Sequence, residues 1–337
     1  MKIPESARVT YKGAVDRAGP PLFPHSVAFS SAMTSLKVFM GLGHDTYVMN
    51  AHNRAWRGDR DYLRYLFLSG EGFRFLFDAA EYFRFSLPEG ETPVRDCFAV
   101  TGTPVEIHPH PDCSRVLENL AAGYPALLLG RTASDRALLA TGYDNGGETL
   151  VAWTFLPGGD MTNKSFSPAD CQFIEGWREG LDAALLVRGD PVLPTDAELA
   201  AIYRRALARG TKALRAGRSA PDGTDVSYYD DWIARLQSGD LSSLDPAIWD
   251  LAERRMYLAN FFEHFRPAFG ENAFQAAFGA GDQIHTNMWR VHVLAEENRK
   301  TGASVHWEII EIIKECRALD LKIADDIDAW FHINREA

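Results

Sequence analysis

Three side chains that could bind a metal ion lie close together in the segment Ile107-His-Pro-His-Pro-Asp-Cys113. In an extended chain, alternate residues point to the same side, so that His108, His110 and Asp112 could together hold a divalent ion. The two intervening prolines carry no backbone N–H, which confines the segment to a sheet edge or a loop. The segment therefore predicts either a metal-dependent hydrolase or a solvated, proline-rich loop.

A second pair of potential metal ligands lies in the C-terminal half of the chain. His292 and Glu296 are four residues apart, a spacing that puts both side chains on one face of a helix. The same spacing is typical of an ordinary surface pair, which is the interpretation that we favour.

The elements that would position a catalytic group are most readable between residues 123 and 154. Gly-Tyr-Pro (123–125) precedes an apolar run, and a second apolar run ends in Gly-Tyr-Asp (142–144). Asn145-Gly146 then separates this run from a third one, and this dipeptide between apolar runs is a strong hairpin signal. The pattern predicts three strands, the last two joined by a tight turn.

This order of motifs resembles the second lobe of bacterial papain-like peptidases that process bacteriocin leaders. Upstream, Ala28-Phe-Ser-Ser-Ala-Met33, followed by Gly41, resembles the nucleophile helix of the same group. Ser69-Gly-Glu-Gly-Phe-Arg74 is similar to a segment of the branch related to the butirosin-biosynthesis H protein, and Tyr229-Asp-Asp-Trp232 fits a helical element of that branch. The resemblance covers residues 20–155 and, less specifically, 195–265.

The resemblance implies a catalytic cysteine at the start of the 28–41 helix, a histidine at the start of the 136–142 strand, and an Asp or Asn on the following strand. This sequence holds Ala28, Arg136 (or Ala137) and Thr154 at these positions. Arginine stays protonated and cannot act as a general base. We therefore predict a catalytically degenerate papain-like protein that binds a ligand in the former active-site cleft.

An active enzyme with a displaced nucleophile is the alternative. Shifting the helix register by two residues puts Ser30 at the nucleophile position, where it would need a general base from elsewhere. A displaced cysteine would serve the same purpose. Either would make the chain an amide hydrolase or an acyltransferase. The butirosin-type relative implies an acyltransferase that acts on an aminoglycoside with an acyl-carrier partner, in secondary metabolism.

For the degenerate cleft we expect a peptide, an acyl group or another small molecule as the ligand, and no cofactor. Ser26, Ser30, Arg74, Arg136 and Tyr143 are the side chains expected to line it. Ser26 also suits the N-cap of the helix. The resemblance implies that Arg74 lies beside this helix, in a buried salt bridge or in contact with an anion.

The fold class predicted is α+β, with a papain-like domain over 1–190 and an all-helical domain over 195–331. In the first domain, a helix packs on a small antiparallel sheet. A capping box at Thr195-Asp-Ala-Glu198 starts the helical part, and its first helix is expected to stop at Gly210. Asp245-Pro246 predicts another helix start. The apolar repeat over 305–331 predicts a helix that lies in a bundle or forms a homodimer contact.

Composition excludes several classes of function. The net charge of −11 argues against a nucleic-acid-binding surface. No apolar run approaches the length of a membrane span, and the N-terminus has no signal-peptide pattern. The four cysteines lack Cys-x-x-Cys spacing, which favours reduced thiols and a cytoplasmic location.

Overall fold

The structure is a computed structural model that describes residues 3–12, 28–51, 54–73, 92–130, 137–154, 171–216, 218–219, 225–226, 228–239, 244–302 and 304–334. Its contacts divide the chain into two units. The first contains Met1–Tyr65 and Arg84–Ile202, and the second contains Leu66–Phe83 and Tyr203–Ala337. The chain is thus mixed α/β with a helical C-terminal region, as predicted.

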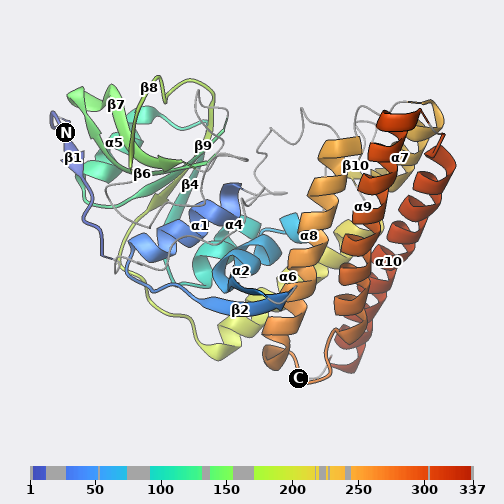
Figure 1. The fold of residues 1–337 in the computed structure, drawn as a ribbon. Helices are drawn as coiled ribbons and strands as arrows, with labels where there is room; N and C mark the ends of the chain where they lie inside the picture. Colours follow the sequence, from blue (N-terminus) through green and yellow to red (C-terminus); the bar gives the residue numbers. More distant parts are fainter. Residues whose placement is uncertain are drawn as a thin grey trace. The chain divides into compact units, whose positions relative to one another are not determined.

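The first unit carries the main sheet and the β2–β3 hairpin (Figure 1). Its strands are β1 (Ala7–Arg8), β2 (Thr46–Ala51), β3 (Arg54–Asp59), β4 (Val105–Pro109), β5 (Ala126–Gly130), β6 (Ala137–Asp144), β7 (Thr149–Thr154), β8 (Gln172–Glu175) and β9 (Leu181–Val187). Its helices are α1 (Ala28–Phe39), α4 (Thr92–Ala99) and α5 (Cys113–Ala121), together with most of α2 (Arg60–Leu68), which continues into the second unit.

The main sheet is antiparallel throughout, in the order β4-β9-β5-β6-β7-β8. Strand β1 pairs with the end of β6, on the same side as β5. A separate hairpin joins β2 to β3. Strand β6 therefore lies in the interior of the sheet, which explains why seven of its eight residues are buried.

Two helices cover the two faces of this sheet. Helix α5 packs over a core that includes Leu138, Tyr143 and Leu150. Helix α1 contacts β5 and β6, and its side chains are absent from that core. Because side chains alternate along a strand, α1 contacts the opposite face, and it is buried along nearly its whole length. The predicted arrangement of an N-terminal helix on an antiparallel sheet is confirmed.

The predicted turn between β6 and β7 is confirmed. Asn145, Gly146 and Gly147 all have positive φ angles, of 53°, 62° and 98°. Asparagine and glycine adopt this conformation more readily than other residues, so the turn is encoded locally. Trp177 donates a hydrogen bond from Nε1 to the carbonyl oxygen of Gly147 at 3.0 Å, which ties the turn to the segment after β8.

The second unit is helical and contains the end of α2, the turn η1 (Glu71–Phe73), the greater part of α6 (Asp196–Ala216), α7 (Tyr228–Gln237), α8 (Leu244–Phe265), η5 (Arg266–Ala268), α9 (Gln275–Thr301) and α10 (His306–Ile333). The short strands β10 (Arg218–Ser219) and β11 (Asp225–Val226) pair with each other. Helices α8, α9 and α10 pack side by side in chain order (Figure 1).

The capping box at the start of α6 is present. Thr195 donates its backbone N–H to Glu198 Oε2 at 2.7 Å, and Glu198 donates its own to Thr195 Oγ1 at 3.3 Å. The predicted end of this helix at Gly210 is wrong, because the helix continues to Ala216. Gly210 is needed for packing, since a Cβ atom there would lie 2.4 Å from the ring of Phe73.

The division into units differs from the predicted boundary at 190–195. The segment that begins at Leu66 belongs to the helical unit, because its aromatic side chains pack among those of α8. Phe67 stacks on Phe261 with ring centroids 3.8 Å apart. Asp245-Pro246 lies in the first turn of α8, as predicted.

Helix α10 confirms the predicted long C-terminal helix. Its apolar stripe, which includes Ile309, Ile312, Cys316, Ile323 and Ile327, is buried against helices of the same chain. Packing within the helical bundle therefore accounts for the burial of this apolar stripe. No helix among the described residues is long and apolar enough to cross a membrane.

Candidate functional site

The candidate site lies where the first turn of α1 and the start of β6 were predicted to meet. Ala28 is the first residue of α1. Strand β6 begins at Ala137, which is one of the two positions, with Arg136, predicted to replace the histidine. Arg136 itself, together with Ser26 and Arg74, lies outside the described residues. The distance between positions 28 and 136 therefore stays a prediction.

The third predicted position lies next to the start of β6. Thr154 is the last residue of β7, and its Cα is paired with that of Leu138. Leu138 belongs to the core beneath α5, so this pairing does not bring position 154 to the α1 side of the sheet. The role predicted for Thr154 beside position 136 stays a prediction.

Ser30, the alternative nucleophile, lies in the first turn of α1 with its side chain fully buried. Its hydroxyl makes no hydrogen bond to any described residue, while its carbonyl oxygen accepts one from Thr34 Oγ1 at 3.0 Å. A serine needs a hydrogen-bonded base to become nucleophilic. No such base contacts Ser30 in the described part of the chain.

Tyr143 lies away from this site. It belongs to the core beneath α5, on the face of the sheet opposite to α1. A bulge between Ala140 and Gly142 shifts the alternation of β6, which puts Tyr143 on the same face as Leu138. Burial raises the pKa of its hydroxyl. Its position in this core does not bring it to the α1 side of the sheet, where the ligand site was predicted.

The run from His108 to Asp112 does not form a metal centre. His108 Nε2 is 3.2 Å from Glu106 Oε2, which also accepts a hydrogen bond from Arg188. Asp112 accepts a hydrogen bond from the backbone N–H of Ser114 and caps α5, and this bond lowers the pKa of Asp112. Within the described residues, no three potential ligands lie close enough to share a metal ion. Strand β4, which ends at Pro109, is an edge strand of the described sheet, as the prolines of this segment predicted.

Two cysteine thiols have raised pKa values, which is the opposite of what activates a thiol. Burial raises the pKa of the Cys113 thiol, and it raises the pKa of Cys316 to about 12. Nucleophilic cysteines have lowered pKa values, because the thiolate is the reactive form. Neither thiol has the lowered pKa that is typical of a nucleophilic cysteine.

A buried charge network holds α1 against α2. The carboxylate of Asp61, fully buried, accepts hydrogen bonds from Lys37 Nζ at 2.7 and 2.8 Å and from the backbone N–H of Asp45 at 2.8 Å. Next to it, His44 Nε2 is 3.1 Å from Asp59 Oδ2, and burial raises the pKa of Asp59. The sequence could not reveal these pairs, since their members are far apart in the chain.

A second buried network belongs to the helical unit. Arg255 forms a bidentate pair with Asp320, at 2.6 and 2.7 Å, and donates to the carbonyl oxygen of Gly72. Its neighbour Arg254 donates to Glu71 Oε2 at 2.8 Å. Glu71 of the predicted Ser69–Arg74 segment is thus paired with α8, whereas the salt bridge or anion contact predicted for Arg74 lies outside the described residues. We interpret this network as structural.

His292 and Glu296 do not act together. Glu296 forms ion pairs with Arg299 and Lys300, the ordinary surface role expected for it. The His292 ring lies against the indole of Trp249, with centroids 5.2 Å apart.

No protein-family model matches the chain, and no curated protein sequence matches it either.

Proposed function

We propose that the chain is a papain-like protein without peptidase chemistry, which binds a peptide, an acyl group or another small molecule beside the first turn of α1. The observation that carries the proposal is the lack of a usable nucleophile in that turn. Ala28 has no reactive group, and the Ser30 hydroxyl is fully buried with no base among the described residues.

The surrounding fold supports a papain-like origin. A buried helix packs on the central strands of an antiparallel sheet, and the strand predicted to have carried the histidine is hairpin-linked to the next one. Thr154 at the end of that hairpin is a poor substitute for Asp or Asn, because a hydroxyl cannot stabilise an imidazolium as a carboxylate does. This combination favours a binding role over hydrolysis.

Probes of activity and binding test the proposal. The intact protein is incubated with a fluorophosphonate and, separately, with the thioester butyryl-N-acetylcysteamine. We expect that the fluorophosphonate does not label Ser30 and that the thioester releases its thiol no faster than in buffer alone. Saturation-transfer NMR should show that the protein binds the thioester or members of an added peptide library.

Ser30→Ala is the control for residual chemistry. It removes an unpaired buried hydroxyl and is expected to preserve the fold. Thioester cleavage that exceeds the buffer rate and disappears in Ser30→Ala would establish the displaced-nucleophile enzyme instead. The absence of binding by the thioester and by every peptide would contradict the binding role.

A further inference from the structure

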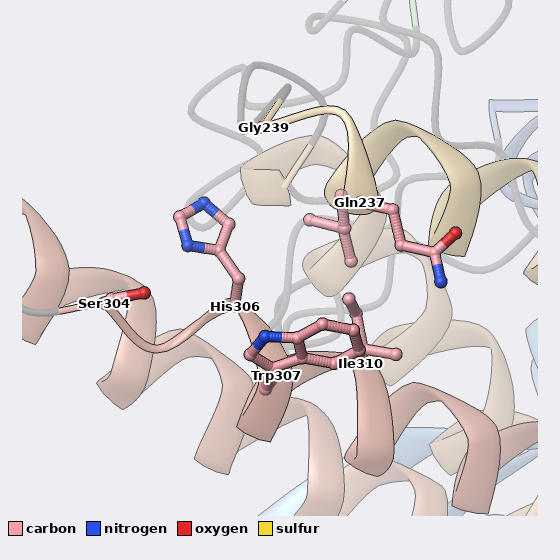
Figure 2. Close-up of a pocket in the computed structure, with 7 residues that line it drawn as sticks. Gln237, Gly239, Ser304, His306, Trp307 and Ile310 are labelled. Atoms are coloured by element: carbon pink, nitrogen blue, oxygen red, sulfur yellow. The ribbon is translucent and has the colours of Figure 1, made fainter.

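A pocket of about 410 Å³ lies in the helical unit, between the C-terminal end of α7 and the first turn of α10 (Figure 2). Its lining includes Leu236 and Gln237 from α7 and His306, Trp307 and Ile310 from α10. Sites for small molecules typically occupy about 300 to 1,000 Å³. The volume therefore suits a compact molecule of one or two rings.

Trp307 differs from the other large apolar side chains of this lining, because 70% of it is exposed. Its neighbours Leu236 and Ile310 are both 1% exposed and form an apolar base. Figure 2 shows the indole between His306 and Ile310, with the Gln237 side chain across from it. Covering an indole with a flat ring removes apolar area from water and adds a stacking contact.

Polar side chains line the pocket beside the indole, and they form no hydrogen bonds within the described part of the chain. The side chains of Gln237, Ser304 and His306 line the pocket, and none forms a hydrogen bond with another described residue. A few convergent polar groups around an apolar surface are what fixes the orientation of a ligand. The pocket thus offers both hydrogen-bond donors and acceptors next to the stacking surface.

Charge narrows the class of ligand. No carboxylate and no Lys or Arg side chain is among the described residues that line the pocket. The net charge of −11 and the nearby Glu308 in the first turn of α10 disfavour an anion. A cation would find no carboxylate among these described lining residues with which to pair. A neutral molecule fits these surroundings best.

We propose that this pocket binds a neutral, planar heteroaromatic or aromatic amide that stacks on Trp307 and forms hydrogen bonds with Gln237, Ser304 and His306. The site lies wholly within the second unit and shares no residue with the candidate site at α1. It is therefore independent of the proposed papain-like function.

Benzamide and cyclohexanecarboxamide are matched probes for this proposal. They carry the same amide, but only benzamide is planar and aromatic. Saturation-transfer NMR with the full chain measures both. We expect benzamide to bind with a Kd on the order of 1 mM, as its small number of atoms allows, and cyclohexanecarboxamide to bind at least fivefold more weakly.

Substitutions identify the site. Trp307→Ala, at an exposed position, should weaken benzamide binding at least fivefold without unfolding the protein. Trp249→Ala is the control, because Trp249 is also partly exposed, at 46%, but does not line the pocket. Three results would each overturn the proposal: no benzamide binding, equal binding of the two amides, or equal effects of the two substitutions.

Discussion

Replacing Asp61 tests whether the buried charge network holds α1 in place. Its carboxylate accepts two hydrogen bonds from Lys37, one from the backbone of Asp45 and a longer one of 3.4 Å from Arg64. Asp61→Asn removes the charge and leaves the Lys37 ammonium, whose side chain is 11% exposed, without its counter-ion. Breaking a buried pair in this way costs about 3–5 kcal/mol, and we expect a loss of that size in the free energy of unfolding.

Urea denaturation followed by tryptophan fluorescence measures this loss as a lower midpoint at an unchanged slope. Glu106→Gln is the matched control, since Glu106 also accepts from a cation but its side chain is 52% exposed. That control should lose about 1 kcal/mol or less. In a Lys37→Met background, Asp61→Asn should cost less, because no ammonium is left unpaired. Equal losses for Asp61→Asn and the control would refute the reasoning.

Three further outcomes are expected. Gly210→Ala should destabilise the protein by about 1–2 kcal/mol despite its gain in helix propensity, because the new methyl group overlaps the ring of Phe73. Gly279→Ala is the control, because the space around Gly279 is open, and it should stabilise the protein by up to about 1 kcal/mol in the same urea titration. Burial raises the pKa of Tyr229 well above 10, so the tyrosine ionises first in the unfolded chain, and the free energy of unfolding should fall as pH rises above 10. Tyr229→Phe should make this fall shallower. An unchanged slope of stability against pH would contradict the prediction. Because the pKa of Cys316 is about 12, iodoacetamide should leave it unmodified at neutral pH until urea unfolds the protein, as mass spectrometry of its peptide can establish.

Much of the fold was predictable where the signal is local. The turn at Asn145-Gly146, the capping box at Thr195 and the long helix over 306–333 each depend on residues that are neighbours in sequence. Gly210 misled the prediction, because glycine at the end of a helix and glycine under an aromatic ring look alike in a sequence. Only the tertiary contact with Phe73 distinguishes the two.

The candidate site was predictable in part. The helix that begins at Ala28 and the hairpin of β6 and β7 were predicted, whereas the meeting of positions 28, 136 and 154 stays a prediction. The bulge that turns Tyr143 away and the ion pairs of Asp61 and Arg255 depend on contacts between distant segments. Such contacts leave no periodic or motif-like trace in a single sequence. The pocket at Trp307 likewise forms only when α7 and α10 pack together.

The most direct test of the central claim restores the missing pair. The variant Ala28→Cys with Arg136→His is compared with Ala28→Cys with Arg136→Gln, and iodoacetamide labelling of the thiol introduced at position 28 is followed by mass spectrometry. If the two positions face each other as in a papain-like site, the imidazole stabilises the thiolate, and labelling at about pH 6.5 should be at least tenfold faster in the histidine variant. Equal rates in the two variants would contradict the papain-like assignment.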